Sequence, residues 1–272
     1  MDIWQDCINK TSHQQLQGQL VRVVESQEQV ATNHLVETLD EQQLLEQMLE
    51  ANKPQLTQSE QPKKNQLHYL LATPFRYPPL KYGSRFGTKS EPSLLYGSKT
   101  LVTALTETAY YRMVFWRGMS SPPPSGKFIT QHTAWGASYQ TAKGMALQQA
   151  PFVEFQSQLA APNSYQASQQ LGAQLRQLGT EAFEFTSARD SNPEYDASNN
   201  TAHSPASAQR GINVALFTPT ALTTRRPAFQ QQWLCETHVD GVSFYSSGRR
   251  EYHHFEQSQF LVNNKFPMPA VS

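Results

Sequence analysis

The stretch GSRFGTKSEPSLLYGSKTLVTALTE, residues 83–107, joins an arginine between two glycines to a short apolar run and then to the start of a helix. The apolar run at residues 93–97 is typical of a buried strand. Ser98 can cap a following helix, because a serine hydroxyl accepts a hydrogen bond from a first-turn N–H. Apolar residues then recur at helical spacing to about Trp116. The stretch therefore predicts a strand followed closely by a helix.

The chain after this stretch predicts more short strands mixed with helices. Asp240-Gly241 favours a two-residue hairpin turn, because such turns need positive φ angles. The remaining predictions are strands at residues 128–132, 182–187 and 212–217, a helix at 164–178, a hairpin of residues 233–239 and 242–246, and a surface loop at 191–208. This order predicts an α+β fold with a mixed β-sheet core and flanking helices.

The first 66 residues differ in composition from the rest, with ten acidic against three basic residues in positions 1–60. Leu16, Leu20, Val23 and Val24, and then apolar residues between positions 35 and 49, recur at helical spacing and predict two or three helices. Residues 55–65 are polar and predict a linker or, equally, a surface loop. We therefore expect a helical N-terminal extension and linker, residues 1–66, before a domain of residues 67–272. The helices either complete the core or dock on the basic remainder, on a second copy or on a partner protein.

Composition excludes several classes of function. With 22 basic and 22 acidic residues the chain has no net field for a polyanion, so we expect no direct nucleic-acid binding and no membrane binding. No apolar run approaches the roughly 20 residues of a membrane span, and the start of the chain lacks a secretory pattern. Two cysteines cannot form a disulfide framework. Together these features predict a cytoplasmic protein.

Few residues have the pattern of a chemical site. His253 and His254 are adjacent, and on a strand their side chains point to opposite faces, so we expect no metal site. Arg76 and Arg85 lie among glycines, prolines and aromatic residues, where a planar guanidinium can meet phosphate oxygens in a sheltered place. Glu107 points away from the apolar stripe of its helix. Each of these residues alone also has an ordinary structural explanation.

The order and spacing of these residues resemble the RES domain family, over roughly residues 67–245. The family takes its name from an arginine, a glutamate and a serine, which match Arg85, Glu107 and Ser187, and Tyr96 matches a fourth site residue. The segments that carry the resemblance are Phe75-Arg76-Tyr77, Gly83-Ser84-Arg85-Phe86-Gly87, Leu95-Tyr96-Gly97-Ser98, Ala104-Leu105-Thr106-Glu107, Phe185-Thr186-Ser187-Ala188-Arg189 and Gly211-Ile212-Asn213-Val214-Ala215-Leu216-Phe217.

The resemblance implies a fold similar to ADP-ribosyltransferases and a toxin of a type II toxin–antitoxin system, with an antitoxin protein as partner. It implies cleavage of the nicotinamide–ribose bond of NAD+, with NAD+ as substrate, no resident cofactor, and inorganic phosphate or water as the attacking group. Glu107 would then stabilise the positive charge that develops on the ribose, and Arg85 would neutralise the pyrophosphate. Tyr96 would contact the nicotinamide and its ribose, and Ser187 would orient the substrate or the nucleophile.

Two further arginines are weaker candidates for NAD+ binding. Arg76 and Arg189 could each add a phosphate contact or have only a structural role. Tyr110 and Tyr111 share the side of the helix that carries Glu107.

Two other functions stay open. The same pocket could pass ADP-ribose to a protein side chain, or the fold could be an inert binding or regulatory module, for example in a homo-oligomer.

Overall fold

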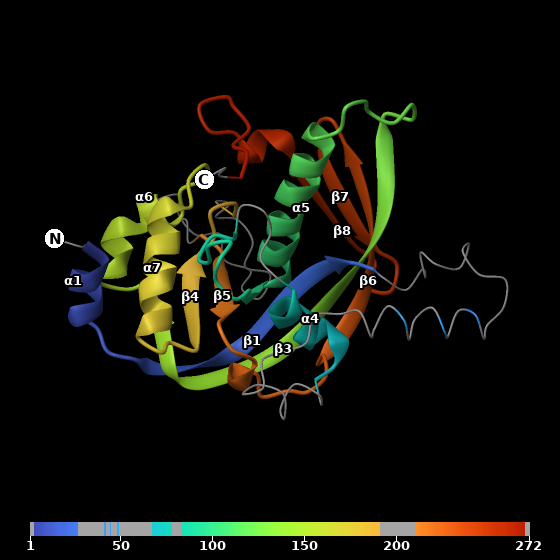
Figure 1. Ribbon diagram of the computed structural model, residues 1–272. Coiled ribbons are helices and arrows are strands. Elements are labelled where there is room, and N and C mark those ends of the chain that lie inside the picture. The colour runs from blue at the N-terminus through green and yellow to red at the C-terminus, as the bar shows by residue number, and fades with distance from the viewer. Residues whose placement is uncertain are drawn as a thin grey trace, which may run out of the picture.

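The computed structural model describes residues 3–26, 41, 44, 48, 67–77, 83–190 and 210–269. These residues form one mixed sheet with helices on its faces (Figure 1). The helical elements are α1 (Ile3–Asn9), α4 (Tyr69–Arg76), α5 (Leu101–Arg117), η1 (Phe152–Phe155), α6 (Gln156–Leu159), α7 (Gln166–Gln177), η3 (Pro219–Ala221) and η4 (Gln257–Phe260). The strands are β1 (Gln14–Glu25), β2 (Leu95–Ser98), β3 (Lys127–Ala146), β4 (Ala182–Thr186), β5 (Ile212–Leu216), β6 (Phe229–His238), β7 (Gly241–Ser246) and β8 (Glu251–Glu256).

The sheet closes on itself. Its strands lie in the order β1-β2-β5-β4-β3-β6-β7-β8, and β1 also pairs with β3. Strand β3 allows this because it is 20 residues long: it pairs with β6 near its start, with β1 along its middle, and in parallel with β4 at its end. Strands β1, β2, β5, β4 and β3 therefore form a ring, from which β6, β7 and β8 extend (Figure 1).

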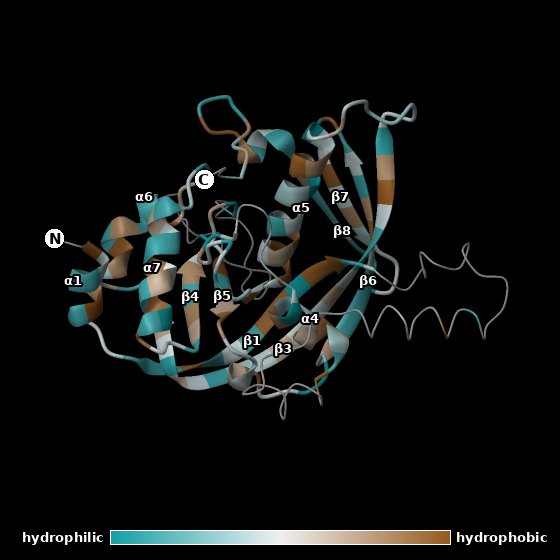
Figure 2. Ribbon diagram, in the orientation of Figure 1, coloured by the Kyte–Doolittle hydropathy of each residue, from teal (hydrophilic) through white to brown (hydrophobic). Residues whose placement is uncertain are grey.

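Strands β4 and β5 are covered on both faces, which explains their apolar sequences. Phe183 and Phe185 of β4 pack in a core cluster with Trp4 of α1 and Leu171 of α7. The alternate residues of the two strands pack in a second cluster on the other face, together with Leu71 of α4. Figure 2 shows the apolar character along both strands. The ends of these two central strands are thus rigid supports for any side chain that follows them.

Helix α5 lies over a third core cluster, in which its apolar stripe packs against Trp233 and Phe244. The helix begins after Thr100, whose Oγ1 accepts a hydrogen bond from the N–H of Thr103 at 3.1 Å. The predicted cap, Ser98, is wrong: this residue ends β2, and its hydroxyl bonds elsewhere. The helix itself is confirmed with nearly the predicted bounds.

Most predicted elements after residue 90 are confirmed. The predicted strands at 93–97, 182–187 and 212–217 correspond to β2, β4 and β5, and the helix at 164–178 corresponds to α7. The strand at 128–132 is the first part of the much longer β3. The hairpin around Asp240-Gly241 is confirmed by β6 and β7, in which His238 pairs with Gly241. The mixed α+β architecture is therefore as expected.

The helix predicted over Leu16, Leu20 and Val24 is wrong, since these residues lie on strand β1. A spacing of four places residues on one side of a helix, but it also places them on one face of a strand, whose side chains alternate with a period of two. The intervening Gln17 and Gln19 are exposed, as a half-buried strand requires. The adjacent β-branched valines favour the strand.

Several predictions lie outside the described residues. These are the linker at residues 55–65, the loop at 191–208, and nearly all of the helical pattern at 35–49, of which positions 41, 44 and 48 are described and helical. Among the described residues, no helix is both long and apolar enough to cross a membrane.

Trp4 connects α1 to the main core, so its truncation tests whether the N-terminal segment stabilises the whole fold. The Trp4 side chain is 2% exposed and meets Phe155 edge-on at 5.6 Å between ring centroids. We expect Trp4→Ala to lower the free energy of unfolding by about 3–5 kcal/mol in urea titration, the usual cost of a tryptophan-sized cavity. The exposed Gln19 of β1 gives the control Gln19→Ala, expected near the wild type. A Trp4→Ala protein as stable as its control would show that α1 is dispensable.

Candidate active site

Glu107 lies on α5 with one carboxylate oxygen fixed by two donors. Its Oε1 accepts hydrogen bonds from Ser187 Oγ at 2.6 Å and from Asn213 Nδ2 at 2.7 Å. Its Oε2 has no hydrogen-bond partner among the residues that the structure describes. Two donors on one oxygen hold the plane of the carboxylate and leave the second oxygen available to a ligand.

Ser187 follows strand β4 and is completely buried. Its hydroxyl donates to Glu107 and accepts from the backbone N–H groups of Arg189 at 3.1 Å and Asp190 at 2.9 Å. A hydroxyl has one donor and two acceptor lone pairs, so all of its hydrogen-bonding capacity is used. The arrangement suits a residue that orients Glu107 and turns the chain after β4, and it leaves no capacity for a substrate contact.

Asn213 of β5 is a site residue that the sequence analysis missed. Its amide donates to Glu107 and accepts from Ser98 Oγ at 2.7 Å, and both Asn213 and Ser98 are buried. These two residues face each other in the register of β2 and β5. The signal in the sequence was a single amide inside the apolar run of residues 212–217, since a buried amide needs partners.

Arg85 lies in a tight loop between Gly83 and Gly87. Its Nη1 donates to the carbonyl oxygens of Leu159 at 3.2 Å and Ala161 at 2.9 Å, and its guanidinium lies 4.7 Å from the ring centroid of Tyr165. Its Nε and Nη2 have no hydrogen-bond partner in the described part of the chain. The guanidinium is thus oriented by neutral groups and retains donors for an anion.

The backbone conformation of this loop requires a glycine at position 83. Gly83 has φ +70°, and a Cβ there would collide with the carbonyl oxygen of Gly87. Ser84 and Gly87 pair as an isolated bridge, and Gln169 Nε2 donates to the Ser84 carbonyl at 3.0 Å. The turn is therefore closed by its own backbone and by helix α7.

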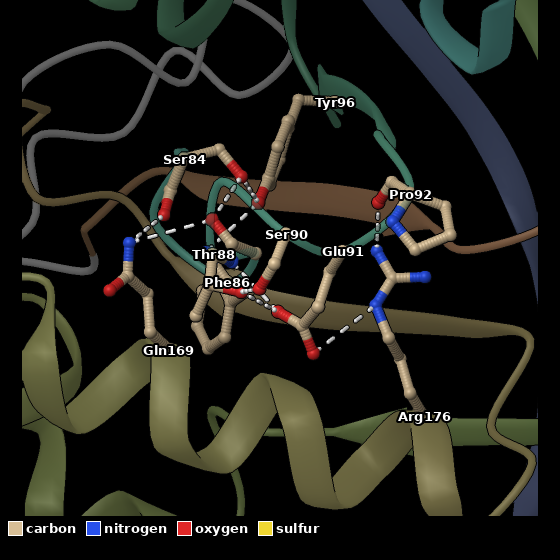
Figure 3. Close-up of polar contacts among 10 residues, drawn as sticks. Ser84, Phe86, Thr88, Ser90, Glu91, Pro92, Tyr96, Gln169 and Arg176 are labelled. Carbon is tan, nitrogen blue, oxygen red and sulfur yellow. Dashed lines mark hydrogen bonds and ion pairs between the residues drawn. The ribbon is translucent and has the colours of Figure 1, made fainter. Parts of the chain in front are cut away.

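Tyr96 holds the loop that carries Arg85. Its hydroxyl bonds to Ser84 Oγ at 3.0 Å and accepts from the N–H of Phe86 at 3.0 Å, so it contacts the residues on both sides of Arg85 (Figure 3). Burial raises the pKa of Tyr96 to about 12, so the phenol stays protonated near neutral pH. The hydroxyl is thus engaged with the protein. The contact of Tyr96 with the nicotinamide and its ribose, through its aromatic face or its hydroxyl, stays a prediction.

Tyr110, Tyr111 and Tyr165 lie near both Arg85 and Glu107. Tyr165, beneath Arg85, has its hydroxyl 3.4 Å from that of Tyr111, which is one helical turn from Glu107 on α5. Burial raises the pKa of Tyr110, and the charges of Arg189, Arg85 and Glu107 all act on its phenol. The charged groups of Arg85 and Glu107 therefore both lie near these tyrosines.

Arg189 belongs to the same set, whereas Arg76 comes from elsewhere. Arg189 Nη2 donates to the carbonyl of Pro162 at 2.8 Å, and its guanidinium lies 3.4 Å from the ring centroid of Tyr110. Arg76 ends α4, which packs against the face of β4 and β5 opposite to the one that Phe86 covers. A role for Arg76 in NAD+ binding stays a prediction.

Among the described residues, no three histidine, cysteine or acidic side chains lie together in a way that could hold a metal ion. His253 and His254 lie on β8, where His253 neighbours Trp233 and His254 bonds to Ser243. The two side chains thus have different neighbours, as expected for adjacent residues of a strand, which point to opposite faces.

Fold and site together define a mixed α+β protein with an arginine and a serine-supported glutamate around shared tyrosines. The model of the RES domain matches residues 62–238, and the chain belongs to this family of NAD+-degrading toxins. No curated protein matches the sequence. The matched range contains every residue of the candidate site, but it leaves out α1, β1, β7, β8, η4 and the residues after η4.

Ser187→Ala tests how strongly the serine supports the buried turn after β4. The substitution leaves the N–H groups of Arg189 and Asp190 without their shared acceptor. We expect the free energy of unfolding to fall by about 1–3 kcal/mol in urea titration, the cost of unsatisfied buried groups. Ser157→Ala, at an exposed position of α6, is the matched control and should change little. Equal stability of the two variants would contradict this role.

Proposed function

We propose that this chain cleaves the glycosidic bond between nicotinamide and ribose in NAD+. The observation that carries the proposal is the Glu107 carboxylate, whose Oε1 is fixed by Ser187 and Asn213 while Oε2 has no partner among the described residues. A carboxylate held in this way can stabilise positive charge as it develops on a sugar, without reorganising during the reaction. Membership of an NAD+-degrading family supports the same function.

The chemistry follows from the charges of the reactants. When the bond between C1 of the ribose and the nicotinamide nitrogen breaks, both bonding electrons leave with the nitrogen. Nicotinamide departs as a neutral molecule, and the ribose becomes oxocarbenium-like. Oε2 of Glu107 would lie against this cation or against a ribose hydroxyl, and the resulting attraction lowers the energy of the transition state more than that of the ground state.

Arg85 would bind the pyrophosphate through Nε and Nη2, because its Nη1 already donates to the carbonyls of Leu159 and Ala161. Tyr96 and Ser187 would act as positioning residues, Tyr96 on the loop that carries Arg85 and Ser187 on Glu107. This assignment differs from the direct substrate contacts expected from the family resemblance. No covalent nucleophile is required.

The attacking group distinguishes the possible reactions. Attack by inorganic phosphate gives ADP-ribose 1″-phosphate, and attack by water gives ADP-ribose with release of a proton. Purified protein incubated with NAD+, with and without phosphate, should release nicotinamide, and mass spectrometry of the sugar product identifies the reaction. If the adenosine part of NAD+ is labelled, transfer of the label to a protein would instead indicate an ADP-ribosyltransferase. No turnover under any of these conditions, from folded protein, would contradict the proposal and favour an inert binding module.

Glu107→Gln removes the negative charge but keeps the size of the side chain. If Glu107 stabilises the transition state, the rate of nicotinamide release should fall about 100-fold or more. Glu154→Gln, at an exposed position of η1, is the matched control and should retain the wild-type rate. A Glu107→Gln enzyme within a few-fold of the control would remove Glu107 from the mechanism.

We also propose that the chain is the toxin of a type II toxin–antitoxin pair, with an antitoxin protein as partner. The support is the family to which it belongs. Induced expression in a bacterial host should stop growth and lower cellular NAD+, whereas expression of Glu107→Gln should do neither. Growth arrest of equal strength with both proteins would show that any toxicity is independent of catalysis.

A further inference from the structure

The C-terminal segment, residues 257–269, lies beyond the residues matched to the family and packs on α5 (Figure 1). After η4 the chain makes a two-residue turn at Asn263 and Asn264, with φ 50° and 59°, and Val262 and Lys265 pair across it. Asparagine tolerates this left-handed conformation better than most residues, so the sequence favours the turn. The turn brings Phe266 back against the helix.

Tyr110 of α5 is the residue that this segment covers. Its ring stacks on Phe266 with 5.3 Å between centroids and 12° between planes, and Phe260 meets it edge-on at 6.0 Å. Its hydroxyl donates to the carbonyl of Pro267 at 2.7 Å. Tyr110 is completely buried as a result. These contacts fix both the position and the tilt of the tyrosine ring.

Arg189 lies on the Tyr110 ring. Its guanidinium carbon is 3.4 Å from the centroid of that ring, which is a close cation–π contact. Arg189 is 5% exposed and has no carboxylate partner among the described residues, and its only side-chain hydrogen bond there goes to Pro162. A buried cation without an anion is costly, so its remaining donors are disposed toward an anionic ligand.

We propose that the C-terminal segment is a positioning element of the NAD+ site: Phe266 and Pro267 fix Tyr110, and Tyr110 orients Arg189 toward the phosphates of the substrate. This inference rests on the proposed function. In this proposal Arg189 binds the substrate directly. Phe266 and Pro267 are positioning residues, which affect the substrate only through Tyr110 and Arg189. Because an arginine on the pyrophosphate binds ground state and transition state alike, loss of its orientation should change KM more than kcat.

Phe266→Ala in the full-length chain tests the proposal, with Phe266→Tyr as the conservative variant that keeps the stacked ring. Met268→Ala, at an exposed position of the same segment, is the matched control. We expect Phe266→Ala to raise the KM for NAD+ about tenfold, the effect of weakening one charged hydrogen bond, with kcat within about threefold. Phe266→Tyr and Met268→Ala should have the wild-type KM. An unchanged KM in folded Phe266→Ala, or equal losses in Phe266→Ala and Phe266→Tyr, would overturn the proposal.

A binding measurement separates this proposal from the proposed reaction. ADP-ribose keeps the pyrophosphate but lacks the scissile bond, so calorimetric titration with ADP-ribose reports on binding alone. We expect Phe266→Ala to bind it about tenfold more weakly than the wild type. If Phe266→Ala does not fold, Tyr110→Phe removes only the bond to Pro267 and should weaken binding by about threefold. Wild-type affinity in the folded variants overturns the positioning role, whereas wild-type protein that binds ADP-ribose but releases no nicotinamide overturns only the reaction.

Discussion

One oxygen atom, Oε1 of Glu107, joins helix α5 to strand β5 and to the end of strand β4. It accepts from Ser187 at the end of β4 and from Asn213 in β5, and Asn213 in turn accepts from Ser98 at the end of β2. These strands are neighbours in the sheet, so α5 has one position at which Glu107 satisfies both donors. The requirement that buried polar groups be paired therefore sets where the carboxylate lies relative to the sheet.

The position of Arg85 depends on a second set of contacts that converge on Tyr96. The tyrosine hydroxyl holds the residues on either side of Arg85, while its backbone carbonyl accepts from Arg22 Nη1 at 2.9 Å. Arg22 belongs to β1, outside the residues matched to the family. Strand β1 therefore supports the arginine loop through Tyr96, in addition to closing the ring of strands. The N-terminal strand and the site are linked by contacts that the family motif does not include.

The sequence predicted best those elements whose structure is determined by a local pattern of residues. The short apolar runs of β2, β4 and β5 and the Asp240-Gly241 hairpin could be predicted, because each has a local pattern with one structural meaning. Strand β1 could not, because a spacing of four residues satisfies helix and strand alike. The partners of Ser187 and Asn213 were also beyond prediction, since their separation from Glu107 is 80 and 106 residues along the chain. Hydrogen bonds of that range depend on strand order, which local patterns do not determine.

The charges around Glu107 are arranged asymmetrically, and this asymmetry matches the proposed substrate. Arg85 and Arg189 are both held by backbone carbonyls and tyrosine rings, and neither has a carboxylate partner in the described residues. Neutral groups orient a guanidinium but do not cancel its charge, so the positive field is left for an anion. Glu107 supplies the opposite charge near the same tyrosines, since its carboxylate and the two guanidinium groups all act on the Tyr110 phenol. NAD+ carries an anionic pyrophosphate and a cationic nicotinamide on either side of one ribose, so it can meet both fields at once.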